Sequence, residues 1–255
     1  MPSKFYTEAE AVKQRAQLND RGSLYNLEDW IIQEIRPYDK MRILDLGCGT
    51  GKQIFAIANH ISPSSMILGL DISKQAVVET NKKAKNENLK QLKAVEGSFD
   101  NCVDLFQGST FDLILSSYAV YYAKDMKGLL SGLRSLLNRN GQVFVCGPGH
   151  GTNEEMTNII NKVIRKGRDK TKLLEDFIDQ PTIVEIGSYY SNFNTVRLHN
   201  QIRFDSLDDV LRWWENHISF IPEIYDDVKK EIQYYFNQKK QFTITKNVLG
   251  VHYYI

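Results

Sequence analysis

The sequence has few of the features that mark secreted or metal-binding proteins. Its 255 residues include three cysteines, Cys48, Cys102 and Cys146, which lie far apart and form no CxxC or Cys/His metal spacing. An odd, scattered set favours free thiols in a reducing compartment. The N-terminal stretch MPSKFYTEAEAVKQR also lacks the apolar core of a signal peptide. We therefore expect a cytoplasmic protein without a bound metal.

Long apolar runs and an excess of one charge are missing as well. No apolar stretch approaches the length of a membrane span, so we expect no membrane insertion. Lys and Arg together number 32 and Asp and Glu 31, which gives a net charge of +1. This balance provides no general attraction to nucleic acid or to an anionic membrane. Neither is expected as a partner.

Short apolar strands alternate with amphipathic helices in residues 40–150. Strands are expected at 42–46, 66–71, 92–96, 111–116 and 142–146. Ser73 and Asp125 are suitable N-caps for two of the helices, the second of which is expected to end near Gly141. This alternation is typical of a parallel sheet with helices on both faces, so the predicted fold class is α/β.

The flanking segments have a different pattern. Helices are expected at 7–18, 27–35, 153–166, 206–217 and 222–237, a strand at 194–204, and one long or bent strand at the C-terminal end. We predict a single domain over 1–255. Its parts are an N-terminal helical lid (1–38), a cofactor-binding core (40–150), a helical and strand elaboration that caps the substrate (151–240), and a final strand (241–255).

The stretch ILDLGCGTG, residues 43–51, places three glycines directly after the first expected strand. Gly47, Gly49 and Gly51 can adopt backbone angles that other residues avoid, and they present no side chain to a ligand. In parallel α/β sheets, ligands bind beyond the carboxyl ends of the strands, where this loop lies. Taken alone, the pattern equally describes a turn that only connects a strand to a helix.

Three further features favour a nucleoside ligand. Asp45 precedes the glycines, and Asp71 closes the second expected strand, where a carboxylate can accept both hydroxyls of a ribose. The spacing is GxGxG, and Lys52 follows the last glycine. A dinucleotide loop has the spacing GxGxxG, whose third glycine allows tight packing near a pyrophosphate. The loop of this chain therefore suits a nucleoside without a pyrophosphate.

Asp45-x-Gly47-x-Gly49-x-Gly51 together with Asp71 resembles the class I S-adenosylmethionine-dependent methyltransferases. Within them it is similar to small-molecule enzymes such as the ubiquinone/menaquinone and biotin-pathway methyltransferases. The resemblance covers about residues 40–150. It implies a Rossmann-like, seven-stranded, mainly parallel sheet with helices on both faces, an antiparallel last strand and a helical cap. It also implies S-adenosyl-L-methionine as cofactor and S-adenosyl-L-homocysteine as product.

The resemblance assigns cofactor contacts at the first two strand ends. The backbone from Gly47 to Gly51, Cys48 included, would face the methionine part and the ribose. Asp71 would hold the ribose diol, and Ile72 would pack on the adenine. These assignments make the loop the centre of the expected site.

The third and fourth strand ends depart from common family patterns. Where relatives often read Gly-Asp-Ala, this chain has Ser98 and Phe99 after Gly97. Ser98 could hydrogen-bond to the adenine, and Phe99 could stack on it or simply pack in the core. Ser116 would lie under the sulfonium. The sequence Ser-Ser-Tyr-Ala from Ser116 onwards argues against nucleobase amines and glutamine as acceptors, because enzymes for those carry Asn/Asp-Pro-Pro-Tyr/Phe there.

Arg21 and Tyr25 are a further candidate pair for the cofactor. They are four residues apart and could share one helical face, from which they would bind the carboxylate of the methionine part. An exposed arginine and a packed tyrosine are an equally good interpretation, because Gly22 between them breaks a helix.

Methyl transfer from a sulfonium requires few catalytic side chains. The sulfonium is already a good leaving group, so positioning and exclusion of water can supply much of the acceleration. A base is needed only if the acceptor must lose a proton. His150, in the loop CGPGHGTN, is the best candidate base, although the sequence slightly favours the interpretation that it is an exposed loop histidine. Tyr122 could orient the acceptor instead.

The predicted function is transfer of a methyl group to an oxygen or nitrogen, less readily a carbon, of a small organic metabolite, by a monomer or homodimer. The N-terminal segment and the aromatic-rich helices at 206–237 are expected to enclose that acceptor. A protein or RNA methyltransferase is the alternative, without a recognition domain or basic tract to support it. An NAD-type dehydrogenase is disfavoured by the glycine spacing. A degenerate binding protein is disfavoured by the intact acidic and glycine positions.

Overall fold

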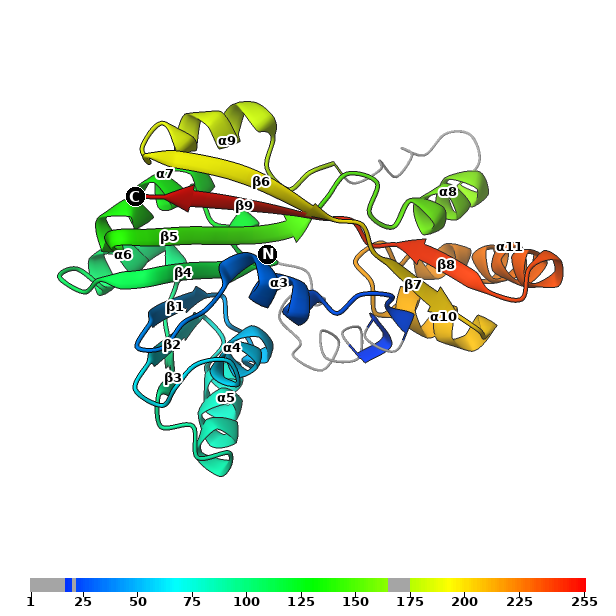
Figure 1. Cartoon of the computed structure of the whole chain (residues 1–255). Coiled ribbons are helices and arrows are strands. Elements are labelled where there is room, and N and C mark those ends of the chain that lie inside the picture. Colours follow the sequence, from blue (N-terminus) through cyan, green and yellow to red (C-terminus); the bar gives the residue numbers. More distant parts are fainter. Residues whose placement is uncertain (1–16, 20–21, 165–174) are drawn as a thin grey trace. The chain divides into compact units, whose positions relative to one another are not determined.

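The computed structural model describes residues 17–19, 22–164 and 175–255 (Figure 1). They group into two compact units. The sheet unit comprises Leu27–Gly147, Asp176–Arg197 and Leu249–Ile255. The second unit comprises the described parts of Met1–Asn26, Pro148–Glu175 and Leu198–Val248. Arg21 and most of the helix expected at 7–18 lie outside the described residues.

The sheet unit contains a seven-stranded sheet in the order β3-β2-β1-β4-β5-β9-β6. The first strands along the chain, β1 to β5, pair in parallel and β9 runs antiparallel, which confirms the predicted fold class (Figure 1). The strands are β1 (Arg42–Leu46), β2 (Met66–Asp71), β3 (Leu92–Glu96), β4 (Phe111–Ser117), β5 (Leu137–Pro148), β6 (Asn192–Leu198) and β9 (Val248–Tyr254).

Helices cover the sheet because its central strands are apolar on both sides. Ile43, Leu44 and Leu46 of β1 are fully buried, as expected when both faces of a parallel sheet are covered. The helices of this unit are α3 (Leu27–Ile35), α4 (Lys52–Ala58), α5 (Lys74–Asn86), α6 (Cys102–Leu105), α7 (Met126–Gly132) and α9 (Gln180–Gly187), with single 3-10 turns at Phe99–Asn101, Val120–Tyr122 and Leu133–Leu136. Among them, α3 contacts α4 and α7 contacts α9.

The expected helix starts are confirmed, but one expected helix end is wrong. Ser73 Oγ accepts a hydrogen bond from the Ala76 amide at 3.3 Å, and Asp125 Oδ1 accepts one from the Gly128 amide at 2.8 Å. The helix that follows Asp125 ends at Gly132 rather than near Gly141. The leucines at helical spacing continue as a 3-10 turn and then as β5, because Leu137 pairs with β4 opposite Phe111.

Helix α9 was not expected, since its neighbourhood reads as a polar stretch. The sequence nevertheless carries a start signal: Asp179 Oδ1 accepts a hydrogen bond from the Thr182 amide at 2.8 Å, and Pro181 lies in the first turn. Ile183 and Ile186 of this helix are buried in the core of the sheet unit. A short helix with two buried side chains leaves only a weak periodic pattern.

The strand expected at 194–204 is two strands that belong to different sheets. β6 joins the large sheet, whereas β7 (Gln201–Phe204) pairs antiparallel with β8 (Phe242–Thr245) in the second unit. Asn200 separates them, and its Oδ1 accepts a hydrogen bond from the Gln201 amide at 2.8 Å. The C-terminal segment is divided in the same way between β8 and β9, which fits the bent alternative.

The second unit packs helices on this two-stranded sheet. They are α8 (Glu154–Val163), α10 (Leu207–Glu215) and α11 (Tyr225–Gln238), with a 3-10 turn at Pro222–Ile224. Trp213 and Trp214 are fully buried, and the ring of His217 stacks on Trp213 at 4.7 Å between centroids. These side chains form an aromatic core. In the described part of the chain, no helix is long and apolar enough to cross a membrane.

A buried histidine makes the sheet unit sensitive to acid. His252 Nδ1 lies 3.1 Å from Gln142 Oε1, its ring lies 4.4 Å from that of Phe144, and burial lowers its pKa to about 4. The unfolded chain therefore binds more protons than the native chain between about pH 4 and pH 6.5. Stability from this residue is present above pH 6.5 and is lost as the pH falls through that window.

We predict that His252→Phe will reduce the acid sensitivity of the fold. Between pH 6.5 and 4, the free energy of unfolding of the variant, measured by urea titration, should fall less steeply than that of the wild type. The two slopes should differ by up to about 1.4 kcal/mol per pH unit. Equal slopes for the two proteins over this range would contradict the assignment of acid sensitivity to His252.

Candidate active site

The glycine loop after β1 has a backbone that only glycine adopts readily. Gly47, Gly49 and Gly51 have φ angles of +76°, +52° and +87°. The amides of Gly47 and Cys48 both donate to the carbonyl of Leu70 in β2, at 2.8 and 3.1 Å. The loop is therefore shaped by its attachment to the neighbouring strand end.

The three glycines differ in what surrounds them. A Cβ atom on Gly47 would lie 2.3 Å from Cβ of Ala119, and one on Gly51 would lie 2.7 Å from the Phe55 ring. These two positions are glycine because the protein itself packs against them. A Cβ on Gly49 would meet no described atom within 4 Å. With respect to the described residues, the bare backbone at Gly49 therefore faces open space, which is the arrangement expected where a ligand approaches.

Asp71, at the end of β2, holds the loop. Its Oδ2 accepts a hydrogen bond from the Gly49 amide at 2.7 Å, and its Oδ1 accepts one from the Ser73 amide at 2.8 Å. Thr80 Oγ1 donates to the Gly49 carbonyl at 3.1 Å. A carboxylate has about four acceptor sites, so Asp71 can bind these amides and still accept hydrogen bonds from a diol. The sequence analysis identified this carboxylate as a ligand contact but did not predict that it also binds the loop amides.

Asp45 is a buried acid beneath the loop. It is 1% exposed, and its Oδ2 accepts no hydrogen bond from the described residues. Burial first, and then the nearby charge of Asp71, raises its pKa to about 8. A buried carboxyl of this kind is typical of a functional site.

We predict that Asp45→Asn will stabilise the protein at alkaline pH. Since the native pKa is raised, the native state binds more protons than the unfolded state between about pH 4 and 8, and stability falls as pH rises through that window. The variant should therefore melt at a higher temperature than the wild type at pH 8, and the difference should vanish near pH 4. A variant that melts lower at pH 8 would contradict the assignment.

The side chains expected around the adenine lie at the ends of β2 and β3. Ile72 directly follows β2 and is 76% exposed, an unusual position for a large apolar side chain. Phe99 is partly buried, and its Cε1 lies 3.8 Å from the position of a Cβ on Gly47. Ser98 Oγ accepts a hydrogen bond from the Asp100 amide at 3.2 Å and so begins the turn that carries Phe99. The fold thus brings Phe99 to the loop.

Ser116 and Cys48 both have structural contacts. Ser116 is fully buried, and its Oγ donates to the Leu46 carbonyl at 2.9 Å, which joins β4 to β1. The Cys48 side chain packs on Gly69, where a Cβ would lie 2.6 Å from its sulfur. Any contact of Cys48 with a ligand therefore has to come from its main chain.

Aromatic side chains gather where β4 ends. Tyr118 has a φ angle of +56°, a strained value for a tyrosine, and such strain is often found at functional sites. Tyr121 lies next to Tyr122 and Phe177, with ring centroids 4.5 and 5.9 Å away. Tyr122 is half exposed. Phe177 was missed because nothing in the sequence around it distinguishes it from an ordinary core residue.

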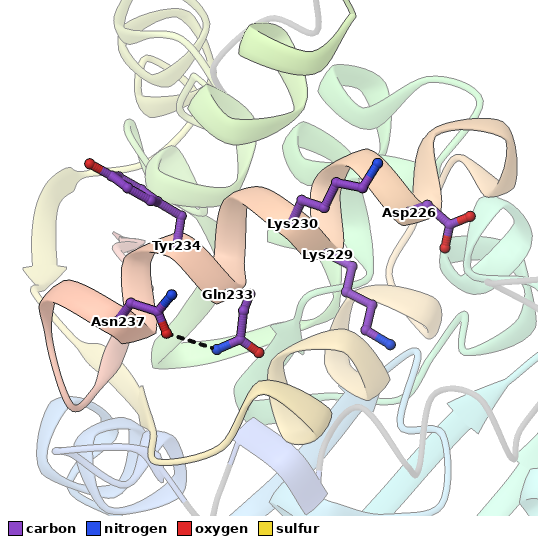
Figure 2. A pocket seen from close by; sticks show the side chains of 6 residues that line it. All are labelled: Asp226, Lys229, Lys230, Gln233, Tyr234 and Asn237. Carbon is purple, nitrogen blue, oxygen red and sulfur yellow. Dashed lines mark hydrogen bonds between the residues drawn. The ribbon is translucent and has the colours of Figure 1, made fainter.

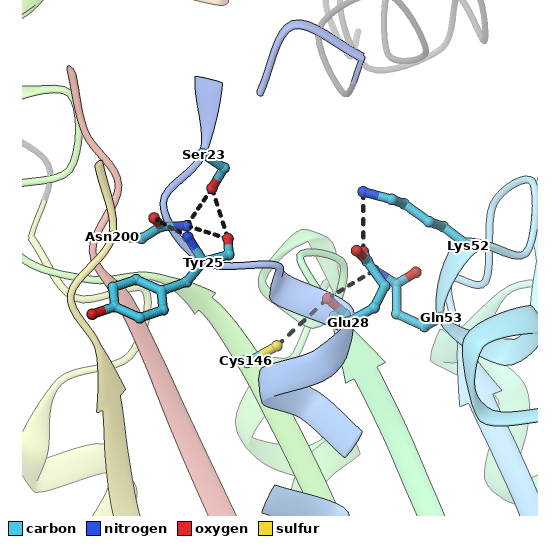
Figure 3. A network of polar contacts seen from close by, with 8 residues as sticks. Ser23, Tyr25, Glu28, Lys52, Gln53, Cys146 and Asn200 are labelled. Atoms are coloured by element: carbon cyan, nitrogen blue, oxygen red, sulfur yellow. Dashed lines mark hydrogen bonds and ion pairs between the residues drawn. The ribbon is translucent and has the colours of Figure 1, made fainter. Parts of the chain in front are cut away.

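Two predicted site residues belong to the second unit. Tyr25 is exposed, its amide donates to Asn200 Oδ1 at 3.1 Å, and its carbonyl accepts from Asn200 Nδ2 and Ser23 Oγ (Figure 3). His150 is exposed, and its carbonyl accepts from Asn247 Nδ2 at 2.8 Å. The second unit also has a surface hollow along one face of α11 (Figure 2). The catalytic and cofactor roles of His150 and Tyr25 stay predictions.

A polar cluster in the sheet unit escaped the sequence interpretation. Glu28 in the first turn of α3 pairs with Lys52, the first residue of α4, at 3.0 Å (Figure 3). Gln53 Nε2 and Cys146 Sγ both donate to Ser117 Oγ, at 3.4 and 3.5 Å. These residues come from separate parts of the chain, so no motif announces them. Across the described ranges, no group of three or more His, Cys, Asp or Glu could hold a metal ion.

The sheet order, the antiparallel β9 and the glycine loop at the carboxyl end of β1 together define a Rossmann-like protein. Residues 37–240 match the family model of a methyltransferase domain, and the chain belongs to this family.

Curated relatives are similar over part of the chain. Aklanonic acid methyltransferase DauC of Streptomyces sp. is 28% identical over 44% of this chain and 50% of its own length. Demethylmenaquinone methyltransferase of Lactococcus lactis is 26% identical over 57% of this chain and 63% of its own length. The matches thus span about half to two thirds of these relatives. YcgJ of Bacillus subtilis has a similar fold, with a TM-score of 0.57, 13% identity, and coverage of 89% of this chain and 97% of that one.

Proposed function

We propose that the protein transfers a methyl group from S-adenosylmethionine to an oxygen or nitrogen of a small organic metabolite. The observation that carries the proposal is the bare backbone at Gly49, which faces open space while its amide is held by Asp71. A cradle without side chains beside a diol-binding carboxylate suits the ribose and thioether of a nucleoside sulfonium. Membership of the methyltransferase-domain family implies the same donor.

The residues around the loop fit the parts of this donor. Asp71 would accept hydrogen bonds from the ribose hydroxyls with its remaining lone pairs. The exposed side chain of Ile72 would pack on one face of the adenine, with Phe99 and Ser98 at its edge. The donor, when bound, supplies a sulfonium that is a good leaving group. The protein's contribution is to orient it and to exclude water.

The acceptor side is proposed at the end of β4. Tyr122 is half exposed beside Tyr121, so its ring can contact an acceptor and its hydroxyl can orient one. His150, which belongs to the second unit, stays the proposed base for an acceptor that must lose a proton. Some of the relatives have names that support a small-molecule acceptor, such as a nocamycin O-methyltransferase from Saccharothrix syringae that is 25% identical over 46% of this chain.

Calorimetry and a transfer assay test this proposal. S-adenosylmethionine and S-adenosylhomocysteine should bind with micromolar dissociation constants, which correspond to a binding free energy of about −8 kcal/mol. NAD should not bind. Incubation with labelled S-adenosylmethionine and a cell extract should label small metabolites. Binding of NAD alone would contradict the cofactor, and label found only in protein or RNA would contradict the acceptor class.

A further inference from the structure

Glu28 is a buried acid that the assigned site does not use. Its side chain is 9% exposed, and Lys52 Nζ lies 3.0 Å from its Oε1 (Figure 3). Lys52 directly follows Gly51, so this ion pair lies immediately after the glycine loop. The Lys52 side chain is 39% exposed. A buried acid is thus paired with a partly exposed base next to the loop.

Glu28 shares its surroundings with Asp45. Burial first, and then the negative charges of Asp45 and Glu28, raise the pKa of the Cys146 thiol to about 12. Cys146 is paired with Ser117 across β4 and β5, at the carboxyl end of the sheet where the glycine loop also lies.

Each of the two carboxyl groups also has a buried oxygen that accepts no hydrogen bond of good geometry from the described residues. These oxygens are Asp45 Oδ2 and, despite the short ion pair of Glu28, Glu28 Oε1. A buried acceptor without a donor is costly, and the cost is larger for a charged group. A ligand group with several N–H donors and a positive charge would satisfy the Glu28 oxygen.

We propose that Glu28 and Lys52 bind the amino-acid part of the methyl donor: Glu28 receives its α-ammonium, and Lys52 pairs with its carboxylate. This assignment rests on the proposed function and adds two residues to it. One acid and one base match a zwitterion, and in its absence they neutralise each other. Lys52 exchanges one carboxylate for another when the ligand binds. It takes the part that the sequence interpretation gave to Arg21 and Tyr25.

The test compares ligands with and without the amino-acid part. S-adenosylhomocysteine has both charged groups, whereas 5′-methylthioadenosine has the same adenosine and thioether but neither charge. Calorimetry of the full chain should show that the wild type prefers S-adenosylhomocysteine. Glu28→Gln and Lys52→Met should each weaken its binding by about tenfold or more, as expected for loss of a charge-assisted hydrogen bond, and leave 5′-methylthioadenosine unchanged.

A matched control and a third ligand separate charge recognition from general damage. Glu34→Gln changes another glutamate of α3, one that faces His252, and should leave both affinities unchanged. Decarboxylated S-adenosylmethionine keeps the ammonium and lacks the carboxylate. Its binding should be weakened by Glu28→Gln and not by Lys52→Met.

Each outcome decides the assignment. Loss of S-adenosylhomocysteine affinity alone, in a variant with the melting temperature of the wild type, supports it. Unchanged affinity in Glu28→Gln, or equal weakening of both ligands, overturns it while the proposed function stands. A wild type that binds neither ligand overturns the proposed function, and this assignment with it.

Discussion

Gly49→Val is expected to abolish binding of S-adenosylmethionine and S-adenosylhomocysteine while the protein stays folded. A Cβ at this position meets no described atom within 4 Å, so the apolar core is not disturbed. The cost to the fold is the positive φ angle of +52°, about 1–2 kcal/mol for a residue other than glycine. The branched side chain would occupy the space proposed for the donor, and no rotation about χ1 removes it.

Gly47→Ala is the matched control, because a side chain added at this position would collide with the protein itself and not with a ligand. Its Cβ would lie 2.3 Å from Cβ of Ala119, a contact that requires the backbone to move, in addition to the strain of φ +76°. The melting temperature of Gly47→Ala should therefore be well below that of Gly49→Val. If Gly49→Val melts as low as Gly47→Ala, or binds S-adenosylhomocysteine normally by calorimetry, Gly49 does not face the ligand.

Asp71→Ala is expected to weaken S-adenosylhomocysteine binding by at least about tenfold, since charge-assisted hydrogen bonds to the ribose are lost. The structure adds a second cause. The amides of Gly49 and Ser73 lose their acceptors, so the loop becomes less ordered before any ligand arrives. The effect should therefore exceed the loss of two ribose hydrogen bonds alone.

An analogue of S-adenosylhomocysteine without the 2′-hydroxyl separates the two causes. If Asp71 binds the diol, removing the hydroxyl should cost the wild type affinity and cost Asp71→Ala almost nothing. If the carboxylate only holds the loop, removing the hydroxyl should weaken binding to both proteins by the same factor. Calorimetry of the two proteins with the two ligands gives the coupling directly.

The sequence alone determined the core of the fold and the position of the loop. Apolar strands that alternate with amphipathic helices have few stable arrangements other than a covered parallel sheet. Gly47, Gly49, Gly51 and Asp71 form a local motif, so their spacing is visible without any tertiary contact. Ser73 and Asp125 were recognisable as N-caps for the same reason, because a cap depends on residues three positions away.

The tertiary structure decided what depends on contacts between distant residues. The pairing of β4 with Leu137 turned expected helix into strand, and Asn200 divided one expected strand between two sheets. Only the folded chain shows that a Cβ on Gly49 would meet no described atom within 4 Å, while Gly47 is packed against Ala119. Glu28 and Lys52 are far apart in sequence, and burial, which no local pattern records, makes their charges matter. Propensity and spacing describe neighbours along the chain; burial, pKa and charge pairing arise from neighbours in space.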